Sequence, residues 1–136
     1  MDRAKALAMS AAGMQAQSGR LRVVAQNLAN ADSASTTPGG APYRRRTVSF
    51  GDHIDARTGA PLVGIVAEGE DSSPFRTRYE PGNPAADARG YVTLPNVDPI
   101  VETMDMRDAQ EIYSANLAVM QSARGMLTRT IDLLKQ

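Results

Sequence analysis

The side chains best suited to metal binding stand together in the segment "GDHIDAR". His53 is the single histidine of the chain, and Asp52 and Asp55 lie on either side of it. One imidazole and two carboxylates could ligate a divalent cation, but a stable site usually needs three or four ligands with supporting contacts. A solvated turn is the simpler interpretation, so the sequence predicts no metal site and no cofactor.

Three consecutive arginines, Arg44 to Arg46, are the residues best suited to bind a phosphate backbone. The acidic segment "EGED" at 68–71 offsets them, and the whole chain carries 15 basic and 15 acidic residues. Because the net charge is zero, no overall field attracts the chain to nucleic acid or to an anionic membrane. A solvated strand face or intersubunit ion pairs explain the arginines better, and we predict no nucleic-acid partner.

This sequence contains no residue or motif that is recognisable as catalytic. It contains no nucleophile placed beside a base, no glycine-rich phosphate loop and no HExxH motif. The absence of cysteine excludes disulfides and thiolate metal sites without fixing the compartment. We therefore predict no enzymatic activity and no catalytic residue.

The first element that the sequence predicts is a long N-terminal helix. Residues at alternating steps of three and four form one stripe in which large and small side chains take turns: Ala4, Leu7, Ala11, Met14, Ser18, Leu21, Ala25 and Leu28. This period of 3.5 residues favours a second helix beside the first. Gly13 and Gly19 each cost about 1 kcal/mol relative to alanine, so the helix is not expected to be stable alone.

A second long helix is predicted from Pro99 to Leu134. Asp98 is suited to the N-cap and Pro99 to the first helical position, while Glu102 stands one place late for a capping box. One stripe of this helix, its seam, shows the same alternation of large with small or polar side chains as the stripe of the N-terminal helix: Ala109, Ile112, Asn116, Val119, Ala123, Met126, Thr130 and Leu133. A second apolar stripe lies on an adjacent face: Tyr113, Leu117, Met120, Leu127, Ile131 and Leu134.

One partner helix cannot cover both stripes, so we expect copies of the chain or other subunits to cover the rest. Methionines on these stripes are interpreted as packing residues, with a cofactor site as the remote alternative. A self-contained helical hairpin that serves as an adaptor or secretion chaperone is the alternative that the pattern leaves open.

The segment 32–97 differs from both ends. It holds every proline except Pro99, a Ser/Thr/Gly/Pro-rich loop, and short β-branched runs separated by turn signals, which predict two to four short strands. The predicted class is mainly α with a small β insertion: a coiled-coil helix at 1–31, a central loop and β-rich segment at 32–97, and a coiled-coil helix at 98–136. No apolar run is long enough for a membrane span, and no secretory signal is evident.

Three asparagines mark the ends and seams of these helices. Asn30 in "VVAQNLANADS" is predicted to end the first helix in a left-handed conformation, which asparagine tolerates. Asn27 lies at the edge of the first seam and Asn116 occupies a small position of the second. A polar residue in such a seam costs stability but fixes register, so we predict that these side chains specify one helix alignment.

Several motifs together resemble the flagellar basal-body rod proteins, and among them the proximal-rod members of the FlgC type. They are "NLANADS" closing the first helix, "GGAPYRRRTVSF", "GYVTLPNV" before the second helix, and "YSAN" within it. The resemblance implies paired terminal helices that line the inner tube of the axial structure, with the β-rich segment outside.

The resemblance also implies the partners and the location. They would be other proximal and distal rod subunits, the adapter protein at the export gate and copies of the chain itself, in the rod within the periplasmic space. Export would proceed through the flagellar type III channel without a cleaved signal. The predicted assembly interface comprises Leu7, Met14, Leu21, Asn27, Leu28, Asn30, Ile112, Tyr113, Asn116, Leu117, Val119, Met120, Met126, Leu127 and Leu133.

Overall fold

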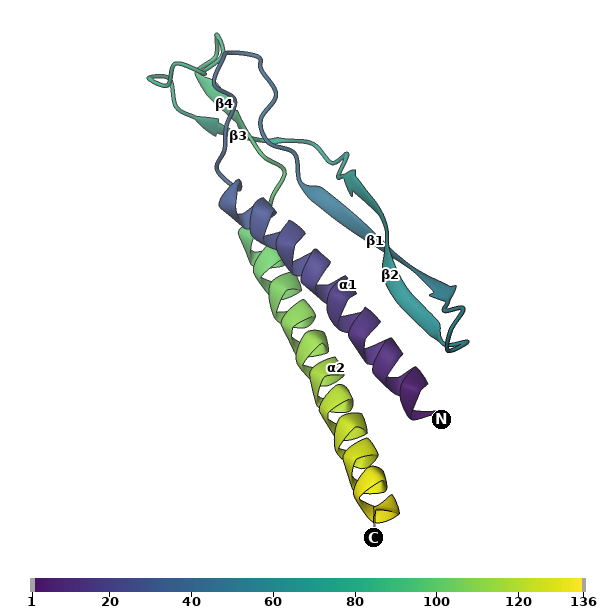
Figure 1. The fold of residues 1–136 in the computed structure, drawn as a ribbon. Helices are drawn as coiled ribbons and strands as arrows, with labels where there is room; N and C mark the ends of the chain where they lie inside the picture. The colour runs from purple at the N-terminus through teal and green to yellow at the C-terminus, as the bar shows by residue number, and fades with distance from the viewer. Residues whose placement is uncertain (1, 136) are drawn as a thin grey trace. The chain divides into compact units, whose positions relative to one another are not determined.

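A computed structural model describes residues 2–135 of the chain, which form two helices and four strands (Figure 1). The strands pair in two separate two-stranded sheets, β1 with β2 and β3 with β4. The predicted class, mainly helical with a small β part, is confirmed, and so are the predicted bounds of the second helix. The elements are α1 (Arg3–Ala29), β1 (Arg46–Ile54), β2 (Pro61–Glu70), β3 (Arg76–Tyr79), β4 (Tyr91–Leu94) and α2 (Pro99–Leu134).

Both helices begin at an aspartate cap. Asp98 Oδ1 accepts a hydrogen bond from Ile100 N at 2.9 Å, which confirms the predicted N-cap of α2. Asp2 Oδ1 accepts one from Ala4 N at 3.1 Å at the start of α1. Each carboxylate satisfies an amide that the first helical turn leaves without a partner.

The first helix ends by side-chain capping. The prediction that Asn30 adopts a left-handed conformation is wrong, because every positive φ among the described residues belongs to a glycine. Asn30 N donates to Gln26 O at 3.1 Å, and Asn30 Nδ2 donates to the same carbonyl oxygen at 2.9 Å. The side-chain amide thus adds a second hydrogen bond to a carbonyl group of the last helical turn, and no left-handed residue is needed there.

The described residues form two compact units. Unit 1 comprises 2–21, 49–67 and 107–135, and unit 2 comprises 22–48 and 68–106. Each unit takes part of both helices and part of the β1–β2 hairpin.

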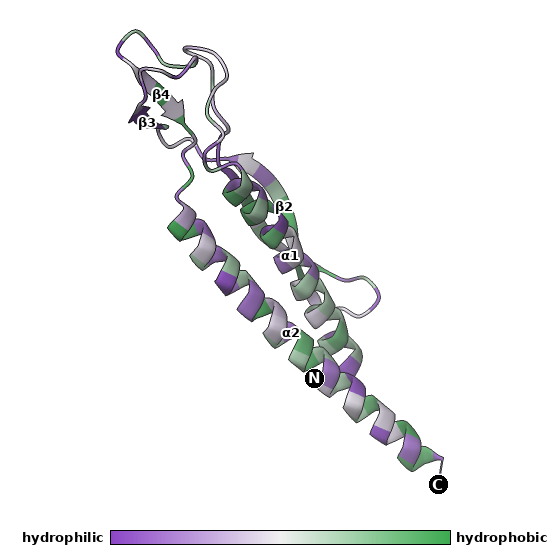
Figure 2. Cartoon of the chain, turned by 90° about the vertical axis from the view of Figure 1, so that its left-hand side faces the viewer, coloured by the Kyte–Doolittle hydropathy of each residue, from purple (hydrophilic) through white to green (hydrophobic). Residues whose placement is uncertain are grey.

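In unit 1, α1 contacts both α2 and β2 (Figures 1 and 2). Three contacts show that the helices run antiparallel: Arg3 Nη1 donates to Thr130 Oγ1 at 2.7 Å, Gly13 lies against the Asn116 side chain, and Arg20 Nη1 pairs with Asp108 Oδ2 at 3.0 Å. On α1, Gly19 lies against Ile65 of β2. The two glycines that weaken the isolated helix therefore let α2 and β2 approach it closely.

The most buried stripe of α1 is not the predicted one. The small members of the predicted stripe are exposed and its large members are half-buried, whereas the buried residues of α1 in unit 1 are Ser10, Gly13, Ala16 and Gln17. Small and polar side chains occupy the closest contacts because they let neighbouring elements approach, a property that an apolar pattern does not report. On α2, likewise, Ala109 and Ala123 of the predicted seam are buried while its large members are exposed.

Unit 2 has an aliphatic core, as the composition predicts. Its antiparallel β3–β4 sheet pairs Arg76 with Leu94 and Tyr79 with Tyr91. The buried apolar residues come from α1, from the chain after it, from the β3–β4 connection, and from β4 and the chain that follows it: Val23, Val24, Ala31, Ala85, Val92, Leu94 and Val97.

The contact between Gly13 and Asn116 generates the first prediction. A Cβ atom at position 13 would lie 2.8 Å from Asn116 Nδ2, whereas one at Gly125, also within a helix, would meet nothing within 4 Å. Gly125→Ala should raise the free energy of unfolding by about 1 kcal/mol through helix propensity. Gly13→Ala should lack this gain in the native background and recover it in an Asn116→Ala background.

Chemical denaturation of the four variants measures this coupling as a double-mutant cycle. Equal gains from Gly13→Ala in both backgrounds would show that the close approach of the two helices imposes no constraint.

Candidate functional site

A buried asparagine connects three elements of unit 2. Asn27 on α1 is 1% exposed, and its side chain makes four hydrogen bonds. Nδ2 donates to Arg46 O at 2.9 Å and to Glu102 Oε2 at 3.2 Å. Oδ1 accepts from Arg46 N and from the Tyr43 hydroxyl, at 2.9 and 2.8 Å. The amide therefore uses its full capacity of two donors and two acceptors.

The carboxylate of Glu102 extends this network into the first turn of α2. Its side chain is fully buried, and besides the Asn27 bond it accepts one from Arg45 Nε through Oε1. Arg45 also pairs with Asp71 at 3.4 Å, and its backbone N donates to Asn96 Oδ1 at 2.8 Å. A buried carboxylate is tolerable only when it is paired and hydrogen-bonded, and here both oxygens have partners.

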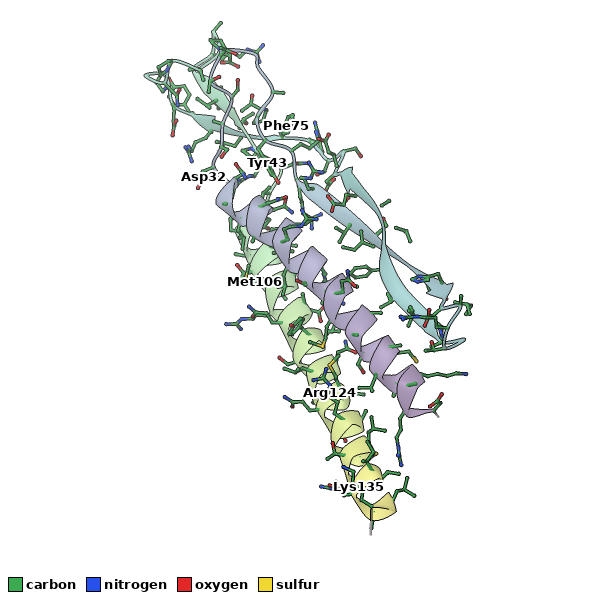
Figure 3. All side chains as sticks on the ribbon, in the orientation of Figure 1. Asp32, Tyr43, Phe75, Met106, Arg124 and Lys135 are labelled. Carbon is green, nitrogen blue, oxygen red and sulfur yellow. The ribbon has the colours of Figure 1, made fainter. Side chains whose placement is uncertain are left out.

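We call this set of residues the polar junction: Asn27, Tyr43, Arg45, Asp71, Asn96 and Glu102. No buried side-chain nitrogen or oxygen among the described residues lacks a hydrogen-bond partner. Figure 3 labels Tyr43 near the point where β1 begins. Within unit 2, the junction joins the end of α1, the first turn of α2 and the start of β1.

The junction shifts the pKa values of its members in ways that strengthen it. Burial raises the pKa of the Tyr43 phenol, so the hydroxyl stays protonated and donates to Asn27. Burial opposes the charge of Arg45, but the hydrogen bonds and charges of Glu102 and Asp71 together outweigh it and raise the pKa of the guanidinium. Hydrogen bonds from the backbone and hydroxyl of Ser73 lower the pKa of Asp71.

One residue of the arginine run, Arg45, has a different role from the predicted one, whereas Arg46 is exposed, as predicted for a solvated strand face. The prediction that Arg45 belongs to a solvated face or an intersubunit ion pair is wrong, because this side chain pairs with Glu102 and Asp71 of its own chain. Arg44 donates to Asp71 O at 2.8 Å, and its guanidinium lies 4.1 Å from the ring centroid of Phe75. Arg46 pairs with Glu68 at 3.4 Å.

Unit 1 has a very different interior. In its described residues, no apolar side chain larger than alanine is buried; the buried residues there are Ser10, Gly13, Ala16, Gln17, Ala60, Ala109 and Ala123. Burial of an apolar side chain is the main favourable term in folding, and alanine contributes little of it. Among its described residues, unit 1 therefore gains no stability from a fully buried large apolar side chain, and its half-buried ones contribute only part of their area.

Most of the large apolar side chains of α2 in unit 1 are exposed instead. Ile112, Val119, Met126 and Leu133 recur every seven residues and are 36–72% exposed; we call these four residues the apolar ridge. Apolar residues recur along α2 in Figure 2. The ridge is accompanied by further exposed side chains, namely Leu117, Leu127, Ile131 and Leu134.

The predicted interface residues fall into three groups. Asn27 is buried in the polar junction, and Asn30 caps α1. A second group is half-buried: Leu7, Met14, Leu21, Leu28, Tyr113, Asn116 and Met120. The exposed group is the apolar ridge with Leu117 and Leu127. Asn116 Nδ2 donates to Ile112 O of its own helix at 3.1 Å, so its contact with Gly13 is steric.

Sequence reasoning missed most of the junction. The sequence places Glu102 only at the start of the second helix, and Tyr43, Asp71 and Asn96 belong to no motif that marks a buried polar group. The available signal was the pair of asparagines in "QNLAN", because asparagine within an apolar helical stripe needs hydrogen-bond partners.

Among residues 2–135, the structure offers no candidate metal site and no candidate membrane-spanning helix. No group of three or more His, Cys, Asp or Glu side chains in this range is placed to hold a metal ion. His53 lies exposed on β1. Neither helix, over the described residues, is apolar for long enough to cross a membrane.

The polar junction generates the second prediction. Asn27→Ala removes four hydrogen bonds and leaves buried partners on β1 and α2 unsatisfied, so it should lower the free energy of unfolding by about 3 kcal/mol. Asn30→Ala is the matched control, because it removes an exposed cap and should cost about 1 kcal/mol or less. Urea denaturation of both variants measures the difference; equal losses would contradict the assigned role of Asn27.

Comparisons with known proteins point to one family along the whole chain. A family described as "Flagellar basal body rod FlgEFG protein C-terminal" matches residues 88–133. The chain is similar to the flagellar basal-body rod protein FlgC of Agrobacterium fabrum, with 46% identity over 93% of this chain and 91% of the relative. FlgC of Salmonella typhimurium is 42% identical over 92% of both chains.

The similarity extends to a distant relative and includes both terminal helices. FlgC of Aquifex aeolicus is 37% identical over 99% of both chains. The aligned region is long enough to span the positions of the polar junction in unit 2 and of the apolar ridge in unit 1. The chain belongs to the FlgC family of flagellar basal-body rod proteins.

Proposed function

We propose that this chain is a structural subunit of the rod of the bacterial flagellar basal body, and that it polymerises through its terminal helices to help form the axial drive shaft and export channel. The observation that carries the proposal is the interior of unit 1, where small residues are buried and the apolar ridge is exposed. Monomeric proteins rarely leave such a surface uncovered, which supports assembly with other chains. Membership of the FlgC family supports the rod as the site of that assembly.

The helices are proposed to pair as a coiled coil within the assembled rod. Their antiparallel contacts at Gly13 and Arg20, and the 3.5-residue period of both, support this pairing. In this proposal 1–31 and 98–136 serve assembly and 32–97 forms the outer, β-rich part. Asn27 fixes the register through its bond to Glu102, and Asn116 fixes it through its steric fit against Gly13.

The proposed partners are other proximal and distal rod subunits, the adapter protein at the export gate and further copies of the chain. The proposed location is the rod in the periplasmic space, reached through the flagellar export channel without a cleaved signal. The role requires neither enzymatic chemistry nor a cofactor. The alternative, a self-contained adaptor or chaperone, can be distinguished by sedimentation. It would remain a monomer or dimer at every concentration, whereas a rod subunit should form larger assemblies as its concentration rises.

Substitutions on α2 test the proposal. Val119→Asp places a charge on the apolar ridge, where assembly would bury it without a partner, so a strain carrying only this variant should make no rod and should not swim. Gln121→Asp is the matched control, because Gln121 is an exposed polar residue of the same helix outside the ridge. It should leave swimming unchanged.

The readouts are swimming in soft agar and electron microscopy of isolated basal bodies. Circular dichroism of both purified variants should match the unmodified chain, since position 119 is 51% exposed. A strain that swims normally with Val119→Asp would overturn the proposed assembly through α2.

A further inference from the structure

All of the sulfur in this chain belongs to methionine. The sequence contains seven methionines, no cysteine and no tryptophan. A cysteine thiolate reacts readily with peroxides, so its absence leaves the methionine thioethers as the side chains most open to oxidation. Which methionine is oxidised first then depends on how much of each side chain is in contact with solvent.

Two methionines among the described residues are exposed, and both belong to α2. Met104 is 66% exposed and Met126 is 52% exposed. The other described methionines, at positions 9, 14, 106 and 120, are half-buried. Peroxide dissolved in water therefore has the freest access to the thioethers of Met104 and Met126.

Met126 differs from Met104 in its place on the helix, because it is a member of the apolar ridge. Val119 precedes it by seven residues and Leu133 follows it by seven. The other three members of the ridge have pure hydrocarbon side chains, so Met126 is the member that mild oxidation can change. A sulfoxide is polar, and covering it with an apolar surface that offers no hydrogen bond costs free energy.

We infer that Met126 is an oxidation site, and that its sulfoxide prevents assembly through the apolar ridge. The inference rests on the proposed function and adds a chemical condition to it: the thioether must be reduced when another chain covers the ridge. The oxidant is hydrogen peroxide from solution, since the chain itself supplies none.

The reaction transfers one oxygen atom. A lone pair of Met126 Sδ attacks one oxygen of hydrogen peroxide, so that the S–O bond forms and the O–O bond breaks. The second oxygen leaves with the proton of the first and becomes water. The sulfur is oxidised to the sulfoxide and the peroxide is reduced, and a methionine sulfoxide reductase can restore the thioether.

Peptide mass spectrometry tests the site in the purified full-length chain. The chain is kept dilute, so that it stays unassembled, and is treated with hydrogen peroxide while the sulfoxide at each methionine is followed over time. Sulfoxide should accumulate several-fold faster at Met126 and Met104 than at the half-buried methionines. A rate at Met126 that is no higher than the rates at positions 9, 14, 106 and 120 would overturn the inference.

Two substitutions at the same position test the consequence for assembly. Met126→Gln places a polar side chain of similar length on the ridge in place of the sulfoxide, so a strain that carries only this variant should lose swimming. Met126→Leu keeps an apolar side chain of similar volume that peroxide does not oxidise, and it should swim normally. Thr128→Gln is the matched control, because it puts glutamine at an exposed polar position outside the ridge, and it should swim normally.

Circular dichroism of purified Met126→Gln should match the unmodified chain, since the native side chain is half exposed. Normal swimming with Met126→Gln, or lost swimming with Met126→Leu, would contradict the assigned role of the sulfoxide. If Val119→Asp abolishes the rod while Met126→Gln leaves swimming unchanged, the proposed function stands and this inference does not.

Discussion

The Asn27 side chain is the constraint on which unit 2 depends. Its amide meets a strand backbone, a tyrosine hydroxyl and a buried carboxylate, and every donor and acceptor is used. Such a group stabilises a structure only when all of its partners are in place, since each missing bond leaves a buried polar atom unsatisfied. The end of α1, the start of β1 and the first turn of α2 must therefore assume their positions together. The Arg45–Glu102 pair reinforces this coupling, because a buried carboxylate without its guanidinium would be strongly destabilising.

The two units solve the problem of stability in opposite ways. Unit 2 buries valines and a leucine around its satisfied junction, although Ile100, Val101 and Met104 at the start of α2 are exposed. In the part of the chain that the structure describes, unit 1 fully buries only alanine, glycine, Ser10 and Gln17, whereas its large apolar side chains are half-buried or exposed. A polar junction of fixed geometry in one unit and an open apolar surface in the other suit a subunit that keeps a defined fold while it offers surface to its neighbours.

Local signals in the sequence were sufficient to predict the helices and the family. The Asp98–Pro99 cap and the long apolar period predicted α2 with its observed bounds, and turn residues separated the strands. The buried stripe of α1 was not predicted, because Ser10, Gly13 and Gln17 are buried for their size and bonding rather than for their hydrophobicity. The partners of Asn27 were equally inaccessible, since Tyr43, Arg46 and Glu102 lie 16, 19 and 75 residues away and no local pattern links them. The left-handed end assigned to Asn30 was wrong because the side chain supplied the cap that the backbone was expected to provide.

In the proposed assembly, the small buried residues of unit 1 make its stability depend on contacts with other chains. Gly13 and Gly19 bring α2 and β2 close to α1, but close packing of small side chains removes little apolar area from water. Each CH₂ group left on the exposed ridge instead of in a core forgoes about 0.8 kcal/mol of burial in the isolated chain. The same groups can yield that free energy when another chain covers them. In the proposed rod, part of the stability that an ordinary domain gains on folding would come from the contact between subunits, and folding of unit 1 would be thermodynamically linked to polymerisation.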